Sequence, residues 1–318
     1  MISLEGGLTF GMLRRSVPLF FIVLLTIPAI PQGTPHSLLW RITGGGENPS
    51  FLFGTVHSRD SRAYQYGDTV RAALNSVSVV AGELDLTNPA ADALGLINSM
   101  MLPEGQKLED LYKKKDWALI EAELKEKIGP MAVMTYRMKP FFVLAMLTEA
   151  GMQADEEKVL DDHLLSTAKE NGQRVIGMET MKEQMAAMDA MGVKEQAGLL
   201  LDHVKNNGYE AELSEMMDAY AAQDLDAIMK ISESSGTMTG PMEKALITDR
   251  NERMVHRLDS MMTAGEDIFF AVGAAHLPGD KGLIQLLRAK GYTVEPVIYS
   301  AKPLPIEEQI EPAIEEKE

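Results

Sequence analysis

The sequence predicts an α/β fold with a central mixed, largely parallel sheet and a long helical insert. Short apolar runs rich in β-branched and aromatic residues, which are typical of buried strands, occur in the N- and C-terminal thirds of the 318 residues. Between them, from about 88 to 265, helix-type patterns dominate. The sheet is therefore expected to form from the two ends of the chain.

The N-terminal strands are expected at 38–42 and 50–53, joined by the glycine-rich turn 44–49. This pattern predicts a β-hairpin. A helix is expected over 68–76 and another buried strand over 77–81. Strand, loop, helix and strand at this spacing predict a βαβ unit whose two strands form a parallel pair.

Within the insert, an amphipathic helix is expected over 155–171 and a further helix over 246–262. Pro140 is suited to the first turn of a buried helix, where its missing N–H costs nothing. A short strand over 174–177 interrupts the helices and carries Glu179 just past its end. The insert is thus expected to add one strand to the sheet.

The C-terminal third begins with the apolar strand 268–272, and Gly273 is expected to let the backbone turn sharply there. A helix over 283–290 and a closing strand over 292–299 follow. The tail 303–318 is rich in Pro and Glu and is expected to be disordered and acidic.

The N-terminal segment 1–32 has the pattern of a secretory signal peptide. Arg14 and Arg15 precede an apolar stretch of about a dozen residues, short for a membrane-spanning helix. We therefore expect an exported protein, periplasmic or secreted, whose α/β domain covers 36–302. The alternative is that the segment is retained and anchors the protein to a membrane.

Charge and composition exclude several functions. The net charge is −17, which argues against binding nucleic acid or an anionic membrane surface, since both need a basic face. The chain has no cysteine, so thiolate metal sites, disulfides and a cysteine nucleophile are excluded. Histidine and carboxylate side chains remain as possible metal ligands.

A Gly-x-x-His pattern occurs twice, each time directly after a predicted strand. The first ends at His57 and the second at His276. Glu83 likewise follows the strand 77–81. Open parallel sheets bind their ligands outside the carboxyl ends of the strands. The two histidines and Glu83 are therefore expected at one edge of the sheet, with Glu179 as a further candidate.

Two neutral imidazoles and one carboxylate form a three-ligand, open site for Zn²⁺, Mn²⁺ or Co²⁺ and one water. Such a metal lowers the pKa of its water from about 16 towards about 7. Glu179 is the candidate general base, with Glu83 the alternative if it is not a ligand. Arg250 or Asn251 could orient the substrate or stabilise an oxyanion.

Other readings of the same residues stay open. A metal-free site would use His57 as general base on a water that Glu83 orients. Purely structural roles are a helix cap for Glu83 or Glu179 and a buried salt bridge for Arg250.

Five motifs in this order resemble the TraB/PrgY/GumN family over roughly 36 to 300. That family is related to the Tiki metalloproteases and more remotely to the erythromycin-esterase/ChaN-like fold. The motifs are Phe53-Gly-Thr-Val-His57, Glu83-Leu-Asp-Leu86, Met178-Glu-Thr-Met-Lys-Glu-Gln184, Asp249-Arg-Asn251 and Val272-Gly-Ala-Ala-His-Leu277.

The resemblance implies an α/β fold with a helical insert and a metal-dependent, hydrolase-like site. In the Tiki branch the two histidines and a glutamate serve a divalent metal used for peptide cleavage. The matching positions here are His57, His276 and Glu83.

The expected function is metal-dependent hydrolysis of a peptide or protein substrate. The alternative is a non-catalytic extracytoplasmic protein that sequesters a peptide, a haem-like ligand or a metal on the same scaffold. An α/β-hydrolase is disfavoured because the chain has no G-x-S-x-G elbow.

Overall fold

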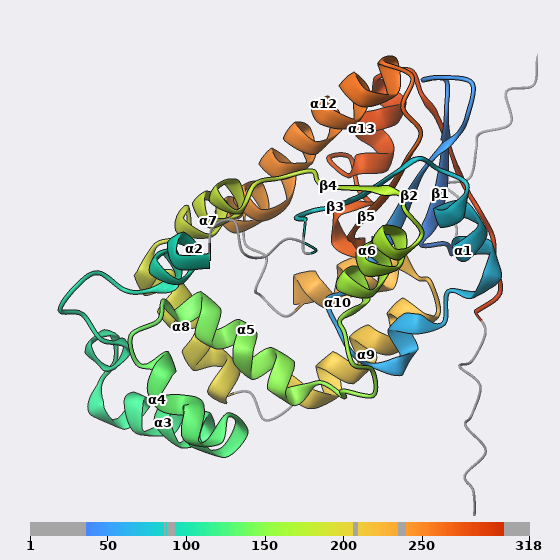
Figure 1. Ribbon diagram of the computed structural model, residues 1–318. Helices are drawn as coiled ribbons and strands as arrows, with labels where there is room; N and C mark the ends of the chain where they lie inside the picture. The colour runs from blue at the N-terminus through green and yellow to red at the C-terminus, as the bar shows by residue number, and fades with distance from the viewer. Residues whose placement is uncertain (1–35, 86, 88–92, 206–208, 235–239, 302–318) are drawn as a thin grey trace, which may run out of the picture. The chain divides into compact units, whose positions relative to one another are not determined.

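The computed structural model describes residues 36–85, 87, 93–205, 209–234 and 240–301. The N-terminal segment 1–32 and the tail 303–318, for which a signal or anchor and disorder are predicted, lie outside these residues. The described part contains a six-stranded sheet with the order β4-β3-β5-β2-β1-β6 (Figure 1).

All six predicted strand regions form strands. Their bounds are β1 (Leu39–Thr43), β2 (Ser50–Thr55), β3 (Val79–Gly82), β4 (Arg174–Gly177), β5 (Ile268–Gly273) and β6 (Thr293–Pro296). The predicted hairpin is confirmed, since β1 pairs with β2 antiparallel; β6 also pairs antiparallel with β1. The pairs β2–β5, β5–β3 and β3–β4 are parallel, which confirms the mixed, largely parallel sheet.

One detail of the predicted topology is wrong. The strands β2 and β3 run parallel but do not pair, because β5 lies between them. Every residue from Ile268 to Val272 is fully buried. Such an all-apolar strand is most stable in the middle of a sheet, with a hydrogen-bonded strand on either side. The N- and C-terminal thirds therefore interleave, so that residues distant in sequence meet at the strand ends.

Helices occupy most of the segment between β3 and β5, as predicted. The helices are α1 (Gly67–Asn75), α2 (Ala93–Met100), α3 (Lys114–Lys127), α4 (Ala132–Thr135), α5 (Pro140–Gly151), α6 (Leu160–Glu170), α7 (Met181–Asp189), α8 (Val193–Lys205), α9 (Tyr209–Ala221), α10 (Leu225–Ser234), α11 (Gly240–Glu243), α12 (Asp249–Thr263) and α13 (Leu283–Ala289). None of them is both long and apolar enough to span a lipid bilayer.

Two helix starts differ from the prediction. The helix expected from 155 begins at Leu160, because the preceding residues bond to the loop after β2: Glu156 N–H donates to Arg59 O. Before α12, the residues Lys244–Thr248 form a π-helical turn.

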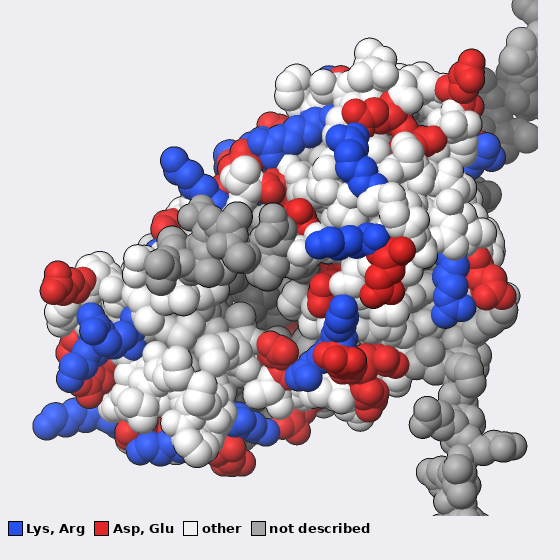
Figure 2. Space-filling view, viewed as in Figure 1, with Lys and Arg blue, Asp and Glu red and all other residues white. Residues whose placement is uncertain are grey.

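The insert has a hydrophobic core of its own. The main cluster of buried residues covers the sheet and includes Phe53, Phe269 and Leu258. A second cluster joins α3, α5 and α8 through Ile120, Val143, Leu200 and their neighbours. On the face seen in Figure 2, Lys and Arg side chains are interspersed with Asp and Glu.

Candidate functional site

The carboxyl ends of neighbouring strands bring the predicted residues to one edge of the sheet. Thr55 at the end of β2 pairs with Gly273 at the end of β5, so His57 and His276 follow adjacent strands. Glu83 follows β3, the other neighbour of β5. Glu179 follows β4, and its N–H donates to the carbonyl of Glu83 at 2.8 Å.

At the glycines of the two Gly-x-x-His motifs, neighbouring atoms leave little room for a side chain. The chain turns into a short 3-10 helix directly after Gly273, but its φ of −49° and ψ of 131° are open to any residue, so the turn does not require the backbone freedom of glycine. A Cβ on Gly273 would lie 3.2 Å from Glu83 Oε1. A Cβ on Gly54 would lie 2.9 Å from Leu277 Cδ1 and 3.2 Å from Ala274 Cα.

His276 is buried and held by Asn251 from α12. Its Nδ1 lies 2.6 Å from Asn251 Oδ1, while Asn251 Nδ2 donates to the carbonyls of His276 (3.2 Å) and Lys281 (2.8 Å). Carbonyls only accept, so the amide oxygen must face the ring and Nδ1 must carry the proton. Burial lowers the pKa of His276 to about 4. The ring is neutral at pH 7, with a lone pair on Nε2.

Glu83 faces that lone pair. Its Oε1 accepts from Gly273 N–H at 3.0 Å and lies 3.7 Å from His276 Nε2, while Oε2 accepts from Gln184 Nε2 at 3.1 Å and pairs with Arg250. Burial by itself raises the pKa of Glu83, but His276, Arg250 and the Gly273 hydrogen bond together lower it below its ordinary value. Glu83 is therefore a carboxylate at neutral pH.

Arg250 forms a buried salt bridge, one of the structural roles considered for it. Its Nε and Nη2 donate to Glu179 Oε2 at 2.8 and 2.6 Å. The other oxygen of Glu179 accepts from Arg253 Nη2 at 3.0 Å, and the Glu179 side chain is fully buried. Glu179 does not cap α7, because Thr180 and Glu183 form the capping box there.

His57 lies outside this network. Its side chain is 67% exposed, and its Nδ1 lies 3.6 Å from Asp161 Oδ2 on α6. The pKa of His57 is raised, chiefly by the interaction with Asp161, with Glu149 and Glu83 adding to it. Within the described ranges, no three His, Asp or Glu side chains lie close enough together to hold a metal. The structure thus joins Glu83 to His276 and leaves His57 beside Asp161.

Three of these neighbours, Gln184, Arg253 and Asp161, were not predicted as site residues. Gln184 belongs to a motif that carried the family resemblance, and the sequence places it one turn into a helix after Glu179. Asp161 gave no signal, because its contact with His57 depends on how α6 lies against the end of β2.

Glu83 and His276 present the kinds of ligand atom that bind a divalent cation. At neutral pH both facing atoms are acceptors, so neither can donate to the other. Their separation of 3.7 Å is within reach of two metal–ligand bonds of about 2 Å each. The hydrogen bond of His276 Nδ1 to Asn251 is the outer contact that metal-binding histidines usually make.

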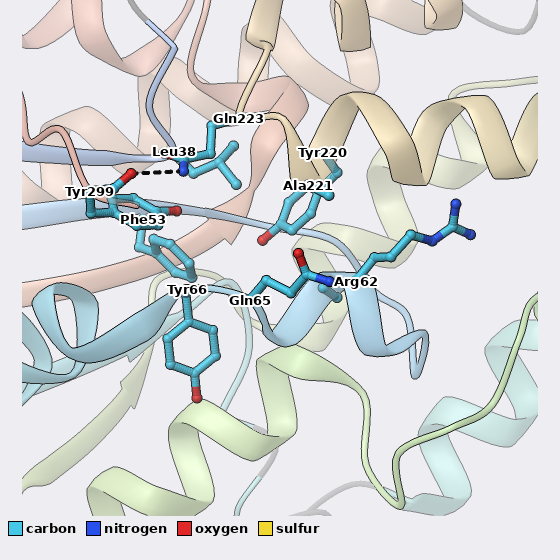
Figure 3. Close-up of a pocket in the computed structure, with 10 residues that line it drawn as sticks. Leu38, Phe53, Arg62, Gln65, Tyr66, Tyr220, Ala221, Gln223 and Tyr299 are labelled. Carbon is cyan, nitrogen blue, oxygen red and sulfur yellow. Dashed lines mark hydrogen bonds between the residues drawn. The ribbon is translucent and has the colours of Figure 1, made fainter. Parts of the chain in front are cut away.

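Two cavities lie among other residues. One of about 10 Å³, room for about one water, is shown in Figure 3; its lining includes Phe53, Tyr220 and Tyr299. The larger, about 260 Å³, lies in the insert beside Glu126, His203 and Tyr209.

The chain is similar to proteins named as metalloproteases. It is 25% identical over 314 residues to Metalloprotease TIKI2 of Xenopus tropicalis, covering 82% of this chain and 60% of that protein. The chain is 24% identical over 318 residues to Metalloprotease TIKI1 of Homo sapiens, and the match covers 83% of this chain and 62% of that protein. The chain thus spans about three fifths of these relatives. No solved structure matches significantly.

The profile of the TraB/PrgY/gumN family matches residues 38–296, from the first strand to the last. It includes both Gly-x-x-His motifs, Glu83 and the Arg250–Asn251 pair. Because this match covers most of the chain, the chain belongs to the TraB/PrgY/gumN family.

Proposed function

We propose that this protein is a metal-dependent hydrolase that cleaves a peptide or protein substrate. The observation that carries the proposal is the pair His276 and Glu83, a neutral imidazole and a carboxylate whose lone pairs face each other at 3.7 Å. The similarity to proteins named metalloproteases supports the choice of substrate class.

The proposed metal ligands are His276, Glu83 and His57, with Zn²⁺, Mn²⁺ or Co²⁺ as the candidate ions. A divalent metal bound there would supply Lewis acidity that activates water and polarises a scissile carbonyl. His57 is exposed and follows β2, the strand that pairs with the one before His276.

The surrounding residues are assigned to positioning. Asn251 fixes the tautomer of His276, and Gly273 N–H with Gln184 fixes the carboxylate of Glu83. Arg250 pairs with both Glu83 and Glu179. Because both oxygens of Glu179 are bound by arginines, we assign Glu179 to this salt-bridge network and not to proton transfer.

We also propose that the protein acts outside the cytoplasm. The support is the pair Arg14 and Arg15 followed by the apolar stretch 16–31, the pattern of a secretory signal. Retention of this segment as an anchor would place the same domain at a membrane surface.

The test combines metal content with peptide cleavage. Protein purified without chelator is analysed for transition metals and assayed on a peptide library, using the wild type, His57→Ala, His276→Ala and the exposed control His256→Ala. We expect about one equivalent of metal and chelator-sensitive cleavage in the wild type and in His256→Ala, with both lost in the other two.

Other results select the alternatives. Metal or peptide binding without cleavage under any condition would favour the non-catalytic binding protein. Cleavage that needs no metal but is lost in His57→Ala would favour the metal-free hydrolase. Absence of both metal and cleavage after reconstitution with each candidate ion would refute the proposed function.

A further inference from the structure

Asp161 is a partly buried carboxylate beside the exposed His57. It lies in the first turn of α6, and its side chain is 18% exposed. Thr55 Oγ1, at the end of β2, donates to Asp161 Oδ1 at 2.6 Å. The other oxygen, Oδ2, lies 3.6 Å from His57 Nδ1, just beyond hydrogen-bonding distance.

Asp161 Oδ2 is buried and accepts no hydrogen bond from the described residues. A buried carboxylate oxygen without a donor is costly, so Oδ2 is expected to have a hydrogen-bond partner. Within the described residues, the basic side chain that forms an ion pair with Asp161 is His57. A small rotation of the exposed His57 ring would let its Nδ1–H satisfy Oδ2.

The backbone keeps the two residues together. Leu160, directly before Asp161, donates its N–H to the carbonyl of Ser58, directly after His57, at 3.1 Å. The Thr55 hydrogen bond ties the same carboxylate to β2. The start of α6 is therefore fixed against the end of β2, and the contact between Asp161 and His57 does not depend on a flexible side chain alone.

The second histidine is held in a matching way. A side-chain oxygen from a helix, Asn251 Oδ1, lies at Nδ1 of His276, as Asp161 Oδ2 lies at Nδ1 of His57. In both cases Nε2 is left for another partner. Metal-binding histidines commonly donate their second ring nitrogen to a carboxylate or carbonyl, which fixes the tautomer and strengthens the ligand.

We propose that Asp161 is a positioning residue for His57, holding its Nδ1–H so that Nε2 is presented to the metal. This inference rests on the proposed function, since it assumes that His57 is a ligand. The two histidines would then be positioned by different groups. The carboxylate of Asp161 holds the exposed His57, and the neutral amide of Asn251 holds the buried His276.

The first experiment measures binding of Zn²⁺ or Co²⁺ alone to the folded protein. The variants are Asp161→Ala, Asp161→Asn, which keeps an acceptor oxygen, and the neighbouring control Asp162→Asn. We expect Asp161→Ala to weaken the affinity about 10- to 100-fold, Asp161→Asn to weaken it less, and the control to match the wild type. Metal binding to the wild type that Asp161→Ala leaves unchanged would overturn the inference.

A second readout needs no metal. Long-range ¹H–¹⁵N spectra of the metal-free protein, labelled on histidine, report which nitrogen of neutral His57 carries the proton. We expect the proton on Nδ1 in the wild type and mainly on Nε2 in Asp161→Ala. The same tautomer in both would refute the role of Asp161. A wild type with no metal affinity would refute the proposed function instead, and the tautomer would then decide whether Asp161 holds His57.

Discussion

Asn251 holds His276 in a single orientation. The amide oxygen faces Nδ1 at 2.6 Å, and the amide nitrogen donates to the carbonyls of His276 and Lys281. Every polar atom of the Asn251 side chain is thus used within the edge of the sheet, and the fully buried side chain fixes the tautomer of the imidazole. The buried histidine of the proposed site is therefore preorganised by one residue of α12.

Asn251→Ala should be destabilising and should weaken metal binding. It leaves the ring N–H and two carbonyls without their partner, which we expect to reduce the free energy of unfolding by about 2–4 kcal/mol. Metal affinity should fall about 10- to 100-fold. Urea unfolding and zinc titration check these values. Asn171→Ala, which removes an exposed contact with Asn75, is the control and should change stability by less than about 1 kcal/mol.

The two histidines should differ in their effect on stability. His276→Ala leaves a buried hole and an unpaired Asn251 oxygen, so we expect a loss of about 2–3 kcal/mol. His57→Ala removes a side chain that is 67% exposed and should change stability by about 0.5 kcal/mol or less. Urea unfolding of both variants, compared with their metal content, checks this separation. Equal destabilisation by the two substitutions would contradict the geometry described.

Two glycine substitutions should have opposite effects. Gly273→Ala places a Cβ 3.2 Å from Glu83 Oε1, so Glu83 must shift, and we expect loss of metal binding with a cost of about 1–2 kcal/mol. Gly198 is an exposed position within α8, and an added Cβ meets no atom within 4 Å. Gly198→Ala should therefore stabilise the protein by about 0.5–1 kcal/mol and leave metal binding unchanged. Thermal unfolding and metal titration of both variants provide the comparison.

The strands, and the edge of the sheet where the candidate residues follow them, could be predicted from the sequence. Buried strands followed by Gly-x-x-His placed His57 and His276 correctly at the ends of β2 and β5, since strand ends are local features. The position of β5 between β2 and β3 was missed, because pairing depends on contacts between distant segments.

The partners of the site residues were harder to predict. The sequence suggested an ion pair for Arg250 without identifying Glu83 and Glu179 as its acceptors. Asp161 was missed entirely, because its role depends on how the start of α6 bonds to the loop after β2. Residue types at strand ends can be read locally, whereas the side chains that orient them come from helices placed by tertiary packing.

Arg250 should be essential for stability. Replacing it by Met would leave two carboxylates without their shared cation, one of them fully buried, and we expect a loss of about 3–5 kcal/mol. Arg253→Met is the control, because Arg253 is 37% exposed and contacts Glu179 but not Glu83. Its loss of stability should be less than half that of Arg250→Met. The double variant Arg250→Met/Glu179→Met should recover part of the loss, which chemical denaturation would measure.

The pair Glu183 and Arg257 should make stability depend on acid pH. Arg257 Nη2 lies 2.6 Å from Glu183 Oε1, and this hydrogen bond, with those from Thr180, lowers the pKa of Glu183 to about 2 from an ordinary value of 4.5. The folded protein therefore holds this proton less tightly than the unfolded chain. The stabilisation is complete above about pH 4.5 and is lost as the pH falls towards 2.

Glu183→Gln tests this linkage, because Gln keeps an acceptor for the helix cap and removes the charge. Allowing for solvent screening of the partly exposed pair, we expect the variant to be about 1–2 kcal/mol less stable at pH 7. The difference should shrink steadily in urea unfolding between pH 5 and pH 3. Glu195→Gln, in the exposed first turn of α8, is the matched control and should show a much smaller change over the same range. A stability difference for Glu183→Gln that is as large at pH 3 as at pH 7 would show that packing, and not the charge of Glu183, is responsible.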